Sequence, residues 1–176
     1  MCSIYDFLVT LLGDDRMSDF NHAFQRIYNM SINEINQKFT FLGEGISRSV
    51  FAVNNKYVIK VAKGREGLYQ NKIEKYVYIH AGKRLRKYLC PILWWRPGML
   101  VMPKAIQLSS LISEEFVDLK KIRKEANSYK EINELAEKFY LLYEDIEAVS
   151  SWGIINDIPV LIDYGCTTQI GDKFYS

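Results

Sequence analysis

The sequence is poor in the residues that bind zinc or form disulfide frameworks. It has three cysteines, Cys2, Cys90 and Cys166, which lie far apart, and two histidines, His22 and His80. This spacing fits no zinc site, and an odd number of distant cysteines is typical of free thiols in a reducing compartment. We therefore expect a cytoplasmic protein without a metal held by Cys and His side chains.

The chain also lacks a strong charge of one sign and a long apolar run. Its 23 Lys and Arg against 21 Asp and Glu give a net charge of +2, so no global attraction to nucleic acid or to a membrane is expected. The apolar stretch near the N-terminus is interrupted by Asp6 and is too short to span a bilayer, which favours a helix over a signal peptide. With 48% hydrophobic residues among 176, the chain can bury the core of one domain and a small extension.

Hydrophobic periodicity divides the chain into three parts. Residues 1–37 carry two amphipathic patterns, one that Gly13 ends and one behind the N-cap candidates Ser18 and Asp19, and predict a helical extension. Residues 38–105 carry five short β-rich runs, with helical spacing at 66–81 between the third and the fourth. This pattern predicts an antiparallel five-stranded sheet with one inserted helix.

Residues 106–176 return to helical spacing. A helix is expected behind Ser113, with an apolar face from Phe116 to Ile122, and a second helix over residues 132–143. Two short apolar runs then flank Asn156-Asp157 and predict a β-hairpin. Such a hairpin would project an acidic side chain, Asp163, from the end of its second strand.

Four elements that could carry chemistry occur in a fixed order along the chain. Gly43 and Gly45 form a glycine loop between two predicted strands, Lys60 lies in the middle of the next strand, and Glu74 lies in the following helix. Asp163 begins an Asp-Tyr-Gly sequence after the last predicted strand. Each has an ordinary explanation when taken alone: a turn, an outward strand residue, a solvated helix position and a turn acid.

In this order, the elements resemble the protein-kinase-like fold. The resemblance is to the reduced forms found among small phosphotransferases and in kinase-like proteins of bacteriophages and other mobile elements, and it covers residues 39 to about 168. It implies an α+β, minimal two-lobe fold with an N-lobe at 38–105, a truncated C-lobe at 106–176 and an N-terminal helical extension at 1–37.

The resemblance further implies a site for ATP and Mg²⁺. Gly43 and Gly45 would let the backbone approach the triphosphate, and Val50 would cover the adenine. Lys60, held by an ion pair with Glu74, would neutralise the α- and β-phosphates.

The remaining implied contacts come from the connector between the lobes and from the acidic motif. Met102 would line the back of the pocket, while the Pro103 carbonyl and the Ala105 N–H would meet the adenine. Asp163 would bind Mg²⁺. Arg48, which replaces a third glycine, could reach phosphate itself or close the loop against an acidic residue.

The chain departs from the family in its catalytic loop. Asp145 stands five residues before Ser150, the spacing of the general base, but the His-Arg pair before it is absent and a second register puts Ile146 at that position. Ser150 or the next serine replaces the family's asparagine, and a hydroxyl is a poorer magnesium ligand than an amide carbonyl. The 11 residues after Gly165 are too few for the family's activation segment and peptide-binding helices, so we expect no conventional protein kinase.

Three functions follow from these expectations. The first is a pseudokinase module that binds ATP and acts through a protein partner, with interference in a bacterial host or its defence system, from the host cytoplasm, as the role that a phage origin would imply. The second is an active minimal phosphotransferase or autokinase with Asp145 as base. The third is nucleic-acid binding through the basic run Lys83–Lys87, for which the plainer interpretation is a solvated turn.

Overall fold

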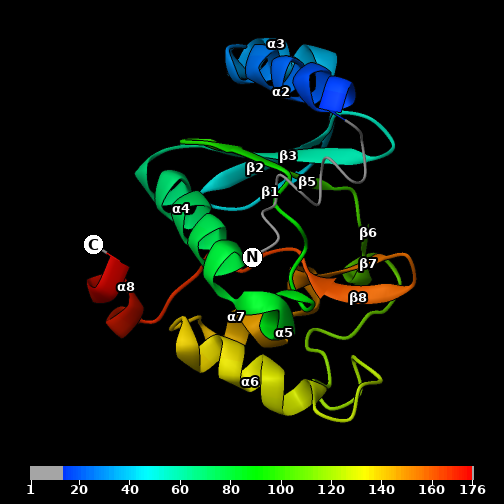
Figure 1. Ribbon diagram of the computed structural model, residues 1–176, viewed down its shortest axis with the longest axis vertical. Helices are drawn as coiled ribbons and strands as arrows, with labels where there is room; N and C mark the ends of the chain where they lie inside the picture. Colours follow the sequence, from blue (N-terminus) through cyan, green and yellow to red (C-terminus); the bar gives the residue numbers. More distant parts are fainter. Residues whose placement is uncertain (1–13, 176) are drawn as a thin grey trace.

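The computed structural model describes residues 14–175, and none of the described helices is long and apolar enough to cross a membrane. A five-stranded sheet lies between two helices on one side and a longer helix with a smaller, mainly helical part on the other (Figure 1). The described helices and strands, in chain order, are α2 (Asp14–Tyr28), α3 (Ile32–Lys38), β1 (Thr40–Glu44), β2 (Arg48–Ala52), β3 (Tyr57–Ala62), α4 (Arg65–His80), α5 (Gly82–Arg86), β4 (Trp94–Arg96), β5 (Met99–Pro103), β6 (Ile106–Gln107), η1 (Leu108–Ser110), α6 (Ser128–Lys138), α7 (Tyr143–Glu147), η2 (Val149–Ser151), β7 (Trp152–Ile155), β8 (Ile158–Leu161) and α8 (Gln169–Tyr175).

The large sheet has the order β1-β2-β3-β5-β4, and all its neighbours are antiparallel. The connection from β3 to β4 carries α4, which the sequence predicted, and the short helix α5, which it did not. Side chains alternate between the faces of the sheet: Ile59 packs toward α2 and α3, whereas Val58 packs toward α4. The five-stranded antiparallel sheet, the helix α4 after β3 and the smaller, mainly helical part beneath confirm the predicted α+β class.

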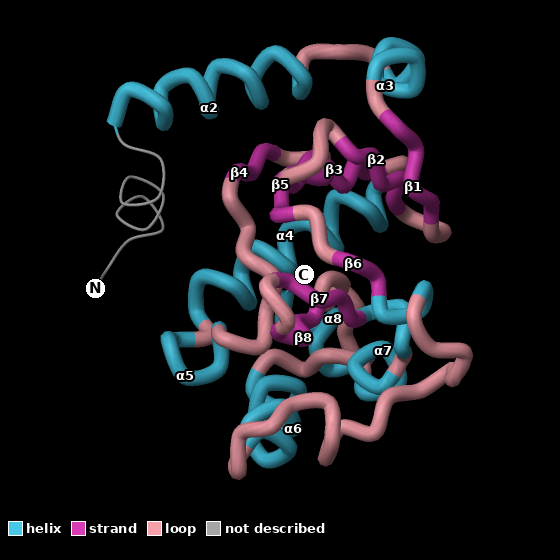
Figure 2. Tube along the Cα trace, turned by 90° about the vertical axis from the view of Figure 1, so that its right-hand side faces the viewer, coloured by secondary structure: helices cyan, strands magenta, loops and turns pink. Residues whose placement is uncertain are grey.

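The outer face of the sheet is covered by α2 and α3 (Figure 2). Phe24 of α2 is 3% exposed and contacts the rings of Tyr57 on β3 and Trp94 on β4, with centroids 5.9 and 6.3 Å away. These helices therefore share a core with the sheet. The described part of the N-terminal extension, residues 14–37, therefore packs on the upper sheet.

The start of this extension differs from the expectation. The prediction that Ser18 and Asp19 cap a helix is wrong, because α2 begins at Asp14 and both residues are exposed within it. The helical spacing of the apolar residues predicted the buried face of α2 correctly. Ser18 and Asp19, which lie on its solvent-exposed side, were mistaken for the residues that cap its N-terminus. The helix expected before Gly13 lies outside the described residues.

The predicted hairpin is confirmed. β7 and β8 are antiparallel, and Asn156 and Asp157 between them have φ values of 49° and 63°. Positive φ at both central residues is the signature of a type I′ turn, which Asn and Asp tolerate better than most residues. The short strand β6 extends this hairpin to a three-stranded sheet that the sequence did not predict.

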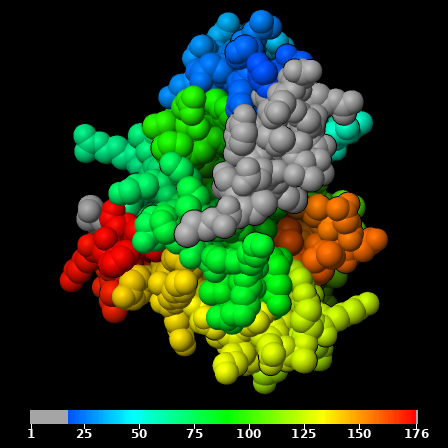
Figure 3. Space-filling view, viewed as in Figure 1, coloured from blue at the N-terminus to red at the C-terminus, as the bar shows by residue number. Residues whose placement is uncertain are grey.

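The helix expected behind Ser113 does not form. Residues 111–127 are irregular and occupy the pole opposite α2 (Figure 3). The Val117 N–H donates to the Glu147 carbonyl at 2.8 Å, and the Val149 N–H donates to the Glu115 carbonyl at 3.0 Å. These long-range bonds satisfy the backbone in place of a helix ladder, so tertiary contacts override the local preference.

The second helix expected in the lower lobe is divided in two. α6 ends at Lys138, and Tyr140 adopts φ of 53°, which no helix can continue through. The chain resumes helical geometry only in α7. The apolar residues keep helical spacing beyond the end of α6 because Leu141, in the loop that follows, is buried in the same core as the apolar residues of α6.

Candidate functional site

A pocket of about 590 Å³ lies between the large sheet and the three-stranded sheet, a size that suits a small organic ligand. Both apolar and charged side chains reach it. Its lining includes these residues singled out in the sequence: Val50, Lys60, Met102, Pro103, Ala105, Ser150 and Asp163. The remaining lining residues are Leu42, Asn55, Val58, Cys90, Lys104, Ile106, Gln107, Ser110 and Ile162.

The central feature of the site is the ion pair between Lys60 and Glu74. Lys60 lies opposite Val50 of β2 and Leu100 of β5 in the sheet register, so it points from the inner face. Its Nζ is 2.8 Å from Oε1 of Glu74 on α4. Both side chains are almost fully buried, which makes the hydrogen-bonded pair necessary, because either charge alone would be costly there.

Arg48 joins this pair from β2. Its guanidinium lies 2.9 Å from Glu74 Oε1 and also forms an ion pair with Asp163. Burial works against the charged guanidinium, but the carboxylates of Glu74 and Asp163 outweigh it and raise the pKa of Arg48. The sequence left two roles for Arg48: to reach phosphate, or to hold the loop against an acidic residue. In the structure, Arg48 pairs with the acidic residues Glu74 and Asp163.

Asp163 follows β8 and lines the pocket from the side of the three-stranded sheet. One oxygen, Oδ1, accepts from Arg48 and lies 3.5 Å from Lys60 Nζ. Burial alone would raise the pKa of this carboxyl, but the charges of Lys60 and Arg48 outweigh it and hold that pKa below its ordinary value. Asp163 is therefore an ionised group with two cationic neighbours.

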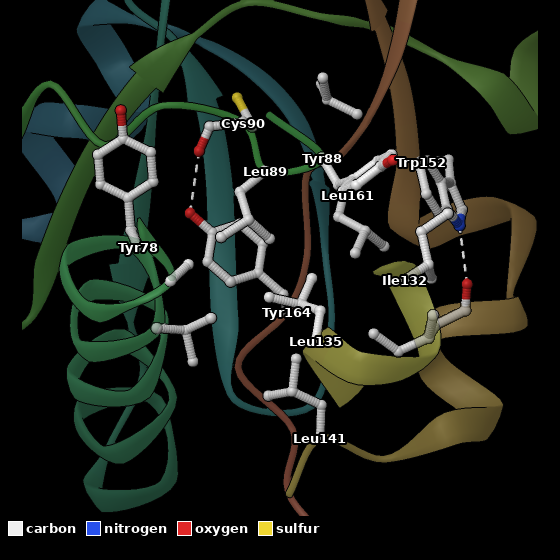
Figure 4. Close-up of a cluster of buried hydrophobic side chains, with 14 of the residues drawn as sticks. Tyr78, Tyr88, Leu89, Cys90, Ile132, Leu135, Leu141, Trp152, Leu161 and Tyr164 are labelled. Carbon is white, nitrogen blue, oxygen red and sulfur yellow. Dashed lines mark hydrogen bonds between the residues drawn. The ribbon is translucent and has the colours of Figure 1, made fainter. Parts of the chain in front are cut away.

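Tyr164 anchors the acidic motif in the core. Its ring lies among Leu89, Leu135 and Leu141, and its hydroxyl donates to the Cys90 carbonyl at 2.9 Å (Figure 4). The tyrosine ring thus fills an apolar site of the core, and its buried hydroxyl has a hydrogen-bond partner.

Gly165, the residue after Tyr164, lies against α4. A Cβ on Gly165 would lie 2.8 Å from the Gln70 carbonyl oxygen. Because only a glycine fits this approach, the acidic motif is fixed against the helix that carries Glu74.

The connector between the lobes forms the back of the pocket. Met102 is 1% exposed and lines it, and the Lys104 N–H donates to the Lys56 carbonyl at 2.8 Å, which holds the connector to the β2–β3 turn. Cys90 lies behind Pro103, with its Sγ 3.8 Å from that carbonyl oxygen. Burial raises the pKa of the Cys90 thiol to about 12, so it acts as a neutral apolar wall.

The glycine loop is tied down on two sides. Lys63 Nζ donates to Glu44 at 2.9 Å and to the Gly45 carbonyl at 3.0 Å, while the Ser47 hydroxyl donates to Gln70 of α4 at 2.6 Å. Gly43 and Gly45 themselves do not line the pocket. Leu42, from the same loop, does.

The structure does not bring Asp145 to the pocket lining. It lies on α7 beside Cys166, whose thiol pKa is raised first by burial and then by the Asp145 carboxylate. Ser150, its partner in the expected catalytic loop, lines the pocket. The assignment of Asp145 as general base stays a prediction.

The two implied cofactors fit this site unequally. The apolar pocket, the connector and Lys60 suit an adenine nucleotide. For Mg²⁺, the expected ligands are Asp163 and the hydroxyl of Ser150, and among residues 14–175 no cluster of three His, Cys, Asp or Glu side chains could hold a metal. Mg²⁺ in nucleotide sites is bound by one or two carboxylates together with phosphate and water oxygens. Among the described residues, Asp163 is the one carboxylate that lines this pocket, and its Oδ1 is already paired with Arg48 and lies 3.5 Å from Lys60 Nζ, so the residues present fit the metal poorly.

Sequence reasoning missed several residues of the site. Asn71 is fully buried on α4, and its side-chain oxygen accepts a hydrogen bond from Arg48 at 3.3 Å. From sequence, a polar residue within a helical pattern is expected to face solvent. Val58 lies two residues before Lys60 and lines the same pocket, which strand alternation could have indicated. No sequence signal marks Cys90 or Ile162.

The basic run Lys83–Lys87 lies mainly in a helix, α5, rather than the solvated turn that was expected. Arg84 forms ion pairs with Glu131 and Glu134 of α6, and Lys87 Nζ is 2.8 Å from Glu131. These carboxylates offset part of the positive charge that a nucleic acid would need. A nucleic-acid role stays a prediction that these contacts do not favour.

Comparisons with known proteins add one structural likeness. No family model matches the chain, and no curated protein matches it. Among solved structures, the chain is similar to the streptomycin–ATP–APH(2")-IIa ternary complex, that of an aminoglycoside phosphotransferase, with 15% sequence identity and a TM-score of 0.44, over 78% of this chain and 71% of that chain. The features of this chain that match the kinase-like pattern expected from the sequence are its strand order, the helix after β3 and the pair of Lys60 with Glu74.

Proposed function

We propose that this chain is a non-catalytic kinase-like module that binds an adenine nucleotide and acts through a macromolecular partner. The observation that carries the proposal is the preformed pocket beside the buried pair of Lys60 and Glu74. A lysine held in this way presents its charge to the pocket without a conformational change, which suits the phosphates of a nucleotide.

Three features support binding without phosphate transfer. The family's base position falls to Asp145, which lies beside Cys166 and outside the pocket lining. Ser150 stands where a magnesium-binding asparagine is expected. Asp163, the remaining acidic group, is paired with Arg48. Phosphoryl transfer depends on a positioned nucleophile and on metal ions at the phosphates, and this site is poor in both.

The proposed partner is a protein. A pocket that binds a nucleotide without turning it over contributes by stabilising one conformation, and a conformational state acts only through something that recognises it. The resemblance to phage-borne kinase-like proteins makes a bacterial host or defence protein, in the host cytoplasm, the partner that we propose. This last step is an analogy of fold family.

Thermal melting of the full chain with and without ATP tests nucleotide binding. A ligand that binds only the folded state raises the midpoint, by the equivalent of about 2.7 kcal/mol at 100 times its Kd. We expect Lys60→Met to remove most of this shift. Lys56→Met, an exposed lysine of the β2–β3 turn, is the matched control and should retain it. The absence of any shift for the wild type would contradict the proposal.

A phosphate-transfer assay tests the non-catalytic part. We expect no release or transfer of γ-phosphate approaching the roughly 1–100 per second of kinases. Activity in that range, lost in both Asp145→Ala and Asp163→Ala with the fold intact, would replace the proposal with the active minimal phosphotransferase.

A further inference from the structure

The ionic cluster beneath the sheet contains an arginine where the kinase-like pattern has a small residue. Arg48 lies on β2 opposite Ala62, two residues before Val50 and therefore on the same face of the sheet. Its guanidinium is held by the carboxylates of Glu74 and Asp163 and by the Asn71 side-chain oxygen at 3.3 Å. A side chain that is 4% exposed and bonded to three partners is part of the site's framework.

We propose that Arg48 takes the electrostatic place of a divalent cation at Asp163, so that the pocket binds a purine nucleoside triphosphate without Mg²⁺. This inference rests on the proposed nucleotide binding and deepens it. It concerns the form of the ligand: the free nucleotide anion in place of its magnesium complex.

Charge balance is the first argument. Lys60 and Glu74 neutralise each other, which would leave Asp163 as an unpaired negative charge facing the phosphates of a bound nucleotide. In this chain Arg48 supplies the missing positive charge, and the four groups sum to zero. The chain itself therefore removes the repulsion that a metal ion would otherwise have to offset.

The second argument is competition for the same oxygen atom. Asp163 Oδ1 accepts from Arg48 and is 3.5 Å from Lys60 Nζ. A Mg²⁺ ion on Oδ1 would have to displace the buried guanidinium, and an ion on either oxygen of this carboxylate would lie beside two positive charges. The buried partners of Arg48 on α4, Glu74 and Asn71, are 0% exposed and hold it in place from the other side.

The direction of the pKa shifts agrees with a permanent pair. The pKa of Asp163 is lowered and that of Arg48 is raised, so both groups stay charged across the neutral range. The phosphates would meet Lys60, which lines the pocket, while Arg48 acts behind it as a positioning residue.

Titration calorimetry of the full chain with ATP, once in EDTA and once in excess Mg²⁺, tests the inference. We expect ATP to bind at least as tightly in EDTA as in Mg²⁺. Binding that Mg²⁺ strengthens by about tenfold or more would overturn the inference and leave the proposed function standing. Failure to bind ATP under either condition would overturn both.

A variant identifies Arg48 as the cause. Arg48→Gln removes the charge but keeps a polar side chain, and we expect its ATP binding to weaken about tenfold in EDTA and to recover when Mg²⁺ is added. Equal binding in both media would overturn the role given to Arg48. If this variant does not fold, Arg48→Lys, which keeps the charge, gives the decisive result: Mg²⁺ dependence in that variant would contradict a purely electrostatic substitution.

Titration of the nucleotide-free chain with Mn²⁺, followed by the loss of its free-ion electron paramagnetic resonance signal, adds a readout that needs no nucleotide. We expect the wild type to bind no Mn²⁺ at the site and Arg48→Gln to gain binding there. Mn²⁺ binding by the wild type that Asp163→Asn abolishes would overturn the inference.

Discussion

The guanidinium of Arg48 and the carboxylate of Asp163 form an ion pair across 115 residues of sequence. The pair joins the strand after the glycine loop to the acidic motif that follows β8. It thereby links the upper sheet to the lower part of the molecule at the edge of the pocket. Its stability, and that of the contacts around it, can be tested by substitution.

Acid should weaken the pair. Because the folded-state pKa of Asp163 is lowered, its contribution to stability is present above the pKa of an unfolded aspartate and is lost as the pH falls below about 4. Urea unfolding from pH 7 to pH 3 should therefore show a free-energy difference between the wild type and Asp163→Asn that shrinks with acid. A difference that stays constant over this range would show that the carboxylate is not stabilised by its neighbours.

Removing one hydroxyl should destabilise the acidic motif. Tyr164→Phe leaves the buried Cys90 carbonyl without its donor, and we expect a loss of about 1–2 kcal/mol in the free energy of unfolding. Tyr143→Phe is the matched control, because that hydroxyl bonds Asn133 in a partly exposed position and should cost less. Equal losses in the two variants would argue against a special role for the Tyr164 hydroxyl.

The α2 helix should contribute to the stability of the whole upper lobe. Phe24→Ala empties a site that is 3% exposed among Tyr57 and Trp94, and we expect a loss of about 3–5 kcal/mol. His22→Ala, on the exposed side of the same helix, should change stability by less than about 0.5 kcal/mol. Chemical denaturation followed by tryptophan fluorescence measures both. A Phe24 variant as stable as the wild type would mean that the extension is not part of the core.

The start of α4 should tolerate no side chain facing the glycine loop. A Cβ on Gly67 would lie 2.3 Å from the Ser47 carbonyl oxygen, so Gly67→Ala must push the loop from the helix. We expect a loss of about 1–3 kcal/mol. Gly45→Ala, which would meet no atom within 4 Å, should have little effect on stability. Melting temperatures of the two variants check this, and the reverse order would contradict the close contact.

Local patterns predicted the sheet and the hairpin well, because their signals are short in range. The β-rich run placed Lys60 in the middle of its strand, while its role in the pocket came from the resemblance, and Asn156-Asp157 indicated a turn whose φ values only a few residue types accept. The position of Asp163 at the end of a strand could then be predicted, because this turn defines where the second strand of the hairpin begins. These features need no knowledge of distant parts of the chain.

Long-range contacts could not be predicted in the same way. The helix expected behind Ser113 does not form because the backbone of residues 115–117 bonds with Glu147 and Val149, about 30 residues further along the chain. Likewise, the two carboxylates that hold Arg48 come from α4 and from the end of β8. From sequence, an arginine in place of a glycine had two open roles, and only the three-dimensional arrangement distinguishes them.

Photolabelling with 8-azido-ATP in EDTA, mapped by mass spectrometry on the full chain, tests the central claim most directly. The account predicts a label on the adenine-facing wall of the pocket, at Val50, Val58 or residues 102–105, that unlabelled ATP competes away. A label confined to Lys83–Lys87, or no label that ATP displaces, would contradict nucleotide binding in this pocket.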